Sequence, residues 1–420
     1  MDENSVRGLL ATALGDEPPI GPVARNSMRA GISLRRRVRI RRAVGGAAAV
    51  AVVAIAIPAA NGAFRNASAG PRTAAPFTVP KVPSVPTGTA YVITSGAGTV
   101  TPIDLASNTA GKPIDVLGEP VAMAVTPDGR TAYVASGATN SGRGATSDQT
   151  VTPIDLTTDT AGKPIILPDP ADAIAIAPNG KTAYVMNGFP TRTVTLIDLA
   201  TGTPGKPITL EGEPEDIVMP PHGKTAYVTV AMDAKTVNGR LQTSFGFAPF
   251  DLATNKVGKP VSLGAAQPGA IAIAPDGKTA YVVSQSSSTV ITMTPIDLTT
   301  NTAERAIKIS TEPGPTSGYF GQPLAIAIAP DGMTAYVADG ASSTVTPIDL
   351  ATGTPGASIS LTGKVGADAI AISSNGAAAY VANQPSSTVT PIDLATNRAE
   401  KPIKIGSGWD SGFEAIVTVP

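Results

Sequence analysis

Residues 325–350 read AIAIAPDGMTAYVADGASSTVTPIDL, and close copies of this stretch recur along the chain. The Ala-Ile run predicts a strand that is buried on both faces. Pro-Asp-Gly predicts a tight turn, because Pro presets φ and Gly accepts the left-handed conformation. The segments around Tyr336 and Ile348 predict two further strands. The Gly-Lys-Pro-Ile segment that follows in other copies predicts a fourth strand at an outer edge, where Pro is tolerated.

Two residues of the repeat, a tyrosine and an aspartate, each recur seven times, which gives two independent counts of its copies. The repeated tyrosines are Tyr91, Tyr133, Tyr184, Tyr227, Tyr281, Tyr336 and Tyr380. The repeated aspartates are Asp104, Asp155, Asp198, Asp251, Asp297, Asp349 and Asp393. Four short strands repeated at this interval are typical of a β-propeller. The sequence therefore predicts an all-β, seven-bladed propeller of four-stranded antiparallel blades over residues 88–420.

The two ends of the repeat region predict how the ring closes. No Ala-Ile strand precedes Tyr91, whereas the final segment 414–420, EAIVTVP, is such a strand with nothing after it. We therefore expect the C-terminal strand to complete the first blade.

At the tyrosine strands the chain resembles the YVTN family of WD40-like β-propeller repeat proteins. The matching segments are Tyr-Val-Ala-Asn at 380–383, Tyr-Val-Ala-Asp at 336–339 and Tyr-Val-Met-Asn at 184–187. The resemblance covers residues 88–420 and implies an extracytoplasmic repeat protein that binds or scaffolds. It supplies no catalytic motif. The basic, alanine-rich N-terminal region is similar to that of bacterial surface proteins.

The N-terminal region predicts a membrane anchor. Residues 1–42 form a short cytoplasmic segment that ends in an arginine cluster, and residues 43–64 carry no charge. A helix of that length spans about 33 Å, enough to cross a bilayer. The arginines place the N-terminus in the cytoplasm. A cleaved signal peptide is the alternative, although 42 residues before the apolar stretch are long for one.

The prediction that follows is a single-pass membrane protein with its propeller outside the cytoplasm. Residues 65–87 carry five prolines, which favours an extended stalk between the anchor and the propeller. Both interpretations of residues 43–64 place everything after Arg65 outside.

The composition excludes several classes of function. A net charge of −1 with 15% charged residues gives no broad basic face for nucleic acid. The chain has no cysteine and a single histidine, His222, which weakens thiol and histidine chemistry. No phosphate-binding loop, metal-ligand motif or nucleophile elbow is present.

Enlarged connections predict which face carries the function. The interval from the repeated tyrosine to the repeated aspartate is 13 or 14 residues in four blades, but 22, 24 and 16 in blades 2, 4 and 5. A further insertion, residues 312–323, precedes blade 6. In an antiparallel blade these connections emerge on one face, which we call the long-loop face. We expect binding residues there, because loops on a rigid scaffold carry function.

Two sets of residues on the long-loop face are candidate sites. Aromatic anchors for a partner are Phe245, Tyr319, Phe320, Trp409 and Phe413; their alternative role is local packing that pins the loops. Carboxylates at one equivalent position at the channel mouth are Asp172, Glu215, Asp368 and Glu414. These acids could hold Ca²⁺ or a cationic ligand, although we favour acids bonded to loops at a strand start.

The leading functional hypothesis is a membrane-anchored binding or scaffold propeller that recognises a protein or a cell-envelope polymer outside the membrane. The alternative is a lactonase-like hydrolase or lyase that uses the channel-mouth carboxylates with a divalent cation. A third possibility is signalling through the cytoplasmic segment. We expect a non-enzymatic role, because the chain lacks histidine on the long-loop face.

Overall fold

The computed structural model describes most of the repeat region, namely residues 88–137, 149–188, 191–232, 235–237, 240–287, 290–310, 324–362, 366–384, 386–405 and 413–419. The predicted cytoplasmic segment (1–42), membrane helix (43–64) and stalk (65–87) lie outside these residues. Within the described ranges, no helix has the length and apolar character that a membrane crossing requires.

Seven antiparallel sheets form the blades, each built outward from an inner strand. The inner strands are β37 (Phe413–Val419), β5 (Glu119–Val125), β10 (Ala173–Ile176), β15 (Glu213–Val218), β22 (Gln267–Ile273), β27 (Leu324–Ile328) and β32 (Ala369–Ile372), in blades 1 to 7. The second strands, which carry the repeated tyrosines, are β1 (Thr89–Thr94), β6 (Thr131–Gly137), β11 (Thr182–Asn187), β16 (Thr225–Ala231), β23 (Thr279–Ser287), β28 (Thr334–Asp339) and β33 (Ala378–Asn383).

The third strand of each blade ends at the repeated aspartate. These strands are β2 (Thr99–Asp104), β7 (Thr150–Asp155), β12 (Thr193–Asp198), β19 (Phe245–Asp251), β24 (Val290–Asp297), β29 (Thr344–Asp349) and β34 (Thr388–Asp393). Blade 4 carries an additional hairpin of β17 (Lys235–Val237) and β18 (Arg240–Gln242) between its second and third strands.

The outer strand differs from the prediction, because it is two short pieces in every blade. The pieces are β3 (Thr109–Ala110) and β4 (Ile114–Asp115), β8 (Thr160–Ala161) and β9 (Ile165–Ile166), β13 (Thr203–Pro204) and β14 (Ile208–Thr209), β20 (Lys256–Val257) and β21 (Val261–Gly264), β25 (Thr302–Ala303) and β26 (Ile307–Ser310), β30 (Thr354–Pro355) and β31 (Ile359–Ser360), and β35 (Arg398–Ala399) and β36 (Ile403–Lys404). In blade 1 the break lies opposite Pro102, which has no N–H to donate, and the Gly111 N–H still bonds the Pro102 carbonyl at 2.8 Å.

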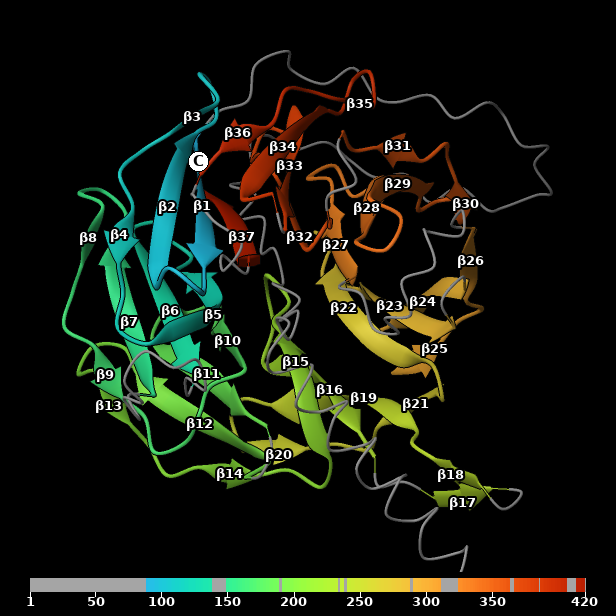
Figure 1. The fold of residues 1–420 in the computed structure, drawn as a ribbon. Coiled ribbons are helices and arrows are strands. Elements are labelled where there is room, and N and C mark those ends of the chain that lie inside the picture. Colours follow the sequence, from blue (N-terminus) through green and yellow to red (C-terminus); the bar gives the residue numbers. More distant parts are fainter. Residues whose placement is uncertain are drawn as a thin grey trace, which may run out of the picture. The chain divides into compact units, whose positions relative to one another are not determined.

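The inner strands close a ring. Each contacts the inner strand of the next blade, and β32 of blade 7 contacts β37, which contacts β5 of blade 2 (Figure 1). The C-terminal strand β37 pairs with β1, with Thr89 opposite Val419 and Thr94 opposite Phe413. The predicted closure of the first blade by the C-terminus is therefore confirmed.

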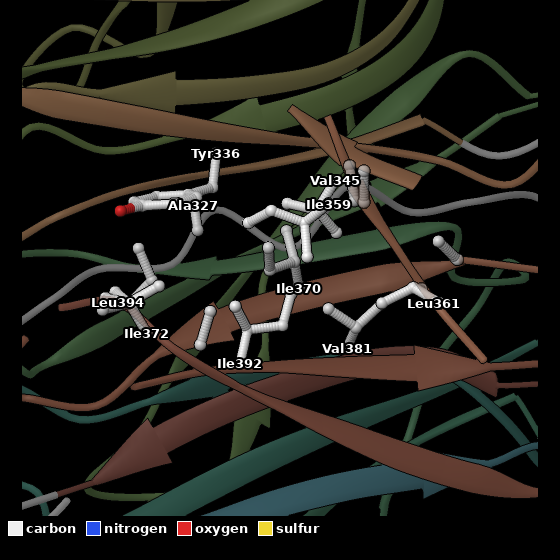
Figure 2. Packing of buried hydrophobic residues seen from close by; sticks show 14 of the residues in the cluster. Ala327, Tyr336, Val345, Ile359, Leu361, Ile370, Ile372, Val381, Ile392 and Leu394 are labelled. Carbon is white, nitrogen blue, oxygen red and sulfur yellow. The ribbon is translucent and has the colours of Figure 1, made fainter. Parts of the chain in front are cut away.

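Seven apolar clusters hold the blades together, one at each boundary between neighbours. At the boundary of blades 6 and 7, Ile370 and Ile372 of β32 pack in one cluster with Ala325 and Ala327 of β27 (Figure 2). The alanines of an inner strand thus face the following blade and its isoleucines face the preceding one. Large side chains meet small ones, which explains why the repeat alternates Ala with Ile.

The repeated tyrosine is a link between blades. Its ring is buried at each boundary. In four blades, those of Tyr91, Tyr227, Tyr336 and Tyr380, its hydroxyl bonds the turn that follows the third strand of the next blade. The Tyr380 hydroxyl donates to the Leu105 carbonyl at 3.2 Å and lies 3.1 Å from Asn108 Oδ1. The Tyr91 hydroxyl lies 2.7 Å from Asp159 Oδ1. Because the tyrosine has this structural role, its sevenfold repetition needs no functional explanation.

We expect Tyr380→Phe to lower the free energy of unfolding by about 1–2 kcal/mol, because it removes a hydrogen bond across the boundary that closes the ring. Tyr133→Phe is the matched control: its ring is also buried, but its hydroxyl bonds no residue that the structure describes. That variant should change stability by less than about 0.5 kcal/mol. Denaturant unfolding of both variants measures the difference. Equal losses would show that the hydroxyl bond contributes nothing.

Candidate functional site

The two faces of the propeller differ in their connections. On one face, the turn between the inner and second strands is the same in blades 2, 3, 5, 6 and 7, with a 2.8 Å hydrogen bond from the N–H of a left-handed glycine to the carbonyl three residues before it. The turn that follows the repeated aspartate lies on the same face. Its Asp side chain caps it; Asp251 Oδ1, for example, accepts the Thr254 N–H at 2.7 Å. This face, which we call the uniform face, repeats the first turn in five blades; blade 4 has Pro-Pro-His-Gly at 220–223 instead, and in blade 1 the inner strand comes from the C-terminus.

The repeated aspartates are structural, as their presence in every blade indicates. In each blade the carboxylate accepts a backbone N–H two or three residues later; the acceptors are Asp104, Asp155, Asp198, Asp251, Asp297, Asp349 and Asp393. Hydrogen bonds from Thr254 hold the pKa of Asp251 below its ordinary value. These exposed or half-buried acids therefore stabilise turns.

The opposite, long-loop face carries the blade-specific connections. The hairpin β17–β18 of blade 4 belongs to it. In blade 5, β23 ends at Ser287 and β24 begins at Val290, so this pair of strands extends farther toward the long-loop face than the equivalent pair of blade 6. The other insertions, residues 138–148 and 311–323, lie outside the described residues. Backbone bonds place both kinds of connection at one end of a blade: the Asp172 N–H, at the start of an inner strand, donates to the Met186 carbonyl near the end of the second strand.

The four predicted carboxylates lie the same number of residues from a common point of the strand register. Each lies three residues before the inner-strand partner of the repeated tyrosine in its blade; those partners are Ala175, Val218, Ala371 and Val417 for Asp172, Glu215, Asp368 and Glu414. The Asp172 carboxylate accepts the Gly188 N–H at 2.8 Å. The Asp368 carboxylate accepts the Gln384 N–H at 2.8 Å. The two aspartates thus anchor the start of the following long-loop connection.

The other two members of this set are less defined. Glu215 is half-buried on β15. Glu414 lies on β37, and its side chain lies outside the description. Among the described residues, no group of three or more His, Cys, Asp or Glu side chains is arranged to hold a metal ion. The possible Ca²⁺ role therefore gains no support from Asp172 and Asp368, each of which uses one carboxylate oxygen to accept a backbone N–H of its own blade.

The aromatic candidates have different positions. Phe245 begins β19, between Ala231 of β16 and Gly264 of β21, and only 8% of it is exposed. It is buried in the sheet, so it is not the exposed anchor that the sequence suggested. Tyr319, Phe320 and Trp409 lie outside the described residues. Phe413 is the first residue of β37, and its side chain is not described.

Two further phenylalanines of blade 4 are also core residues. Phe247 stacks on Tyr227 with 5.1 Å between ring centroids, and Phe250 meets Tyr184 edge to face at 5.8 Å. Both phenylalanines are fully buried. For the aromatic residues of blade 4, the alternative of local packing is therefore correct.

One residue of this face was missed by the sequence interpretation. Asp216 follows Glu215 on β15 and is 6% exposed. Its Oδ1 accepts the Ile217 N–H at 2.8 Å, and its Oδ2 has no hydrogen-bond partner among the described residues. Burial raises its pKa well above the ordinary value of an aspartate. Alignment of the blades would have found it, because the equivalent residue in the other six blades is alanine.

The chain matches no family model and no curated protein. Solved structures share its fold. A functionally unknown protein from Desulfotomaculum acetoxidans aligns with a TM-score of 0.60 at 15% identity, covering 79% of this chain and 99% of that one. The periplasmic gluconolactonase PpgL of Pseudomonas aeruginosa aligns with a TM-score of 0.58 at 17% identity, with the same coverage.

A third similar solved structure is itself described as a β-propeller. The β-propeller domain of Cps50 (Swd1) from Myceliophteria thermophila aligns with a TM-score of 0.51 at 10% identity, covering 70% of this chain and 89% of that one. At such identities the likeness concerns the fold and not the activity. Together with the closed ring of seven sheets, it establishes that residues 89–419 fold as a seven-bladed β-propeller.

Proposed function

We propose that this protein is a membrane-anchored binding or scaffold propeller. In this proposal residues 43–64 cross the membrane, the propeller lies outside the cytoplasm, and the long-loop face recognises a protein or a cell-envelope polymer. The YVTN-like repeats and the bacterial type of N-terminal region agree with it. The lactonase-like alternative rests on the fold alone, since Asp172 and Asp368 use their carboxylates within their own blades.

The observation that supports the proposal best is the difference between the two faces. One face repeats the aspartate-capped turn in all seven blades and the glycine turn in five of them, whereas the other face differs from blade to blade. Uniform turns serve folding, whereas blade-specific connections on a rigid scaffold are where recognition residues concentrate. The additional hairpin β17–β18 is the largest of these connections that the structure describes.

The test uses the full-length protein in detergent as bait for the envelope fraction of the source organism. In the main variant, residues 231–245 are replaced by residues 340–343, which join the equivalent strand ends of blade 6. This replacement removes hairpin β17–β18 and Phe245. We expect capture of the partner to fall at least about tenfold, because hot spots on such a surface are few.

A pair of point variants controls for the face. Leu117 and Met333 are exposed to similar extents, 40% and 55%, but Leu117 precedes an inner strand on the long-loop face and Met333 lies in a turn on the uniform face. Leu117→Ser should weaken capture and Met333→Ser should leave it unchanged. If Met333→Ser loses the partner instead, the partner binds the uniform face, and the proposal that the long-loop face binds it is wrong. If the wild-type protein captures nothing, the binding proposal fails and lactone hydrolysis becomes the next assay.

Location is tested separately. Cells that express the protein with a C-terminal tag are treated with an external protease, and membranes are washed with alkaline carbonate. We expect the propeller to be digested from outside and the tag to sediment with the membrane fraction. Deletion of residues 43–64 should release the protein from that fraction. A protected, soluble wild-type protein would contradict the proposed anchor and orientation.

A further inference from the structure

Asp216 breaks a pattern that every other blade follows. Strand register aligns it with Ala122, Ala173, Ala270, Ala325, Ala369 and Ala415, all of which are buried alanines. An aspartate in such a position is rare unless a partner neutralises it. A residue that breaks a repeat in one blade only is not required by the repeat fold itself, so Asp216 calls for a local explanation.

The side chain faces the boundary of blades 4 and 5. Residues two apart on a strand share a face, and Val218, two residues after Asp216, packs with Ile271 and Val282 of blade 5. Opposite Asp216 on β16 lies Thr229, which is 1% exposed. The carboxyl group is therefore enclosed in an apolar boundary, with one oxygen bonded to the Ile217 N–H and the other unpartnered.

Among the residues that the structure describes, no cation compensates this acid. The negative charge of Glu215, on the same strand, also favours the protonated form of Asp216. Of the strands that pack against β15, β10 and β22 carry no ionisable side chain, and β11 and β16 carry the phenols of Tyr184 and Tyr227. Strand β23, which contributes Val282 to the same boundary, carries the phenol of Tyr281. A neutral carboxyl fits this environment, whereas a carboxylate would need water or an opening of the boundary.

We propose that Asp216 makes the boundary between blades 4 and 5 a proton-dependent joint at the long-loop face. With the carboxyl protonated, the two blades stay closed; loss of the proton loosens them locally. The joint lies next to the insertion of blade 4. Thr229, which is opposite Asp216, is two residues from the end of β16 at Ala231, and the connection that carries hairpin β17–β18 begins there. The raised pKa of Asp216, caused by burial, agrees with this assignment.

The sign of the effect follows from proton linkage. The folded protein holds the Asp216 proton more tightly than the unfolded chain, so stability decreases as pH rises above the ordinary aspartate pKa of about 4 and levels off above the folded pKa. Over that interval the unfolding equilibrium constant of the wild type should rise by up to about tenfold per pH unit relative to Asp216→Ala. Alanine is the residue of the other six blades, so this variant is expected to fold.

The experiment compares full-length wild type, Asp216→Ala and Asp216→Asn by denaturant unfolding between pH 4 and 9. All other titrating groups are common to the three proteins, so the difference isolates Asp216. Wild type alone should lose stability through this site, and both variants should lack that loss. Superimposable pH profiles of wild type and Asp216→Ala would overturn the proposal, and so would a difference that is constant with pH.

Hydrogen exchange locates the change. After correction for the intrinsic pH dependence of exchange, peptides that cover β15 and β22 should exchange faster in wild type at high pH, and at a steady rate in Asp216→Ala. The matched control is the boundary of blades 2 and 3, where Ala122 occupies the equivalent position. Faster exchange at both boundaries would indicate global loosening and contradict a local joint.

Discussion

A chain that ends at residue 412 is expected not to form the closed propeller. It lacks β37, the inner strand of the first blade, so β1 loses its antiparallel partner from Thr89 to Thr94. Two boundaries lose core residues together: Ile416 packs against blade 7, while Ala415, Val417 and Val419 pack against blade 2. Unlike a solenoid, a ring has no terminal repeat that can remain capped at its end.

Circular dichroism and limited proteolysis of the truncated protein measure this effect. We expect loss of the cooperative unfolding transition and rapid cleavage within blades 1 and 7. A truncated protein with wild-type stability would show that the contacts of β37 do not hold the ring, and would contradict the closure described here.

Single substitutions separate the packing of β37 from its presence. Ile416 is fully buried and Ile166, on the outer strand of blade 2, is 60% exposed, so the same change at both positions differs only in environment. Ile416→Ala should cost about 2–5 kcal/mol of unfolding free energy, the range of such truncations in a core. Ile166→Ala should stay within about 0.5 kcal/mol. Similar costs at the two positions would contradict the burial of Ile416.

Much of this fold could be predicted because the repeat encodes it many times. The Ala-Ile strand, the Pro-Asp-Gly turn and the tyrosine strand each recur, so a local ambiguity in one blade is resolved by the others. The position of the closing strand followed from the unmatched segment at 414–420. The number of blades also followed, since the repeated tyrosines and the repeated aspartates each occur seven times.

The features that escaped prediction depend on register and neighbours. The break in the outer strand does not depend on a third-strand proline, because blade 3 has the same break opposite Leu196, whose carbonyl accepts the Gly205 N–H at 2.7 Å as that of Pro102 accepts the Gly111 N–H in blade 1. It is visible only once the strand pairing is known. Phe245 was placed in a loop because the start of β19 cannot be located from spacing alone. Glu215 was selected as a candidate because of its position in the repeat, whereas Asp216 beside it was not. Asp216 faces the apolar boundary between blades, and only the strand pairing distinguishes the environments of the two acids.

Asp368 is expected to make the stability of the propeller depend on pH below neutrality. Its side chain is 8% exposed, and burial raises its pKa to about 7 against the opposing effect of the Gln384 N–H. The folded state therefore keeps a proton that the unfolded chain releases above pH ~4. The contribution of Asp368 to stability should be greatest near pH 4, decrease by up to about 4 kcal/mol as pH rises to about 7, and remain constant above that pH.

Asp368→Asn should remove this dependence without disturbing the loop, because its amide oxygen can still accept the Gln384 N–H. The variant and wild type should be about equally stable near pH 4, and the variant more stable at pH 8. Asp172→Asn is the matched control, since Asp172 makes the equivalent bond to Gly188 but is only half-buried. A larger pH effect at Asp172 would show that burial is not the cause. Both aspartates make the same bond to the start of a loop, but the deeper burial of Asp368 should lower the free energy of unfolding more at neutral pH. Denaturant unfolding across pH 4–8 measures that difference directly.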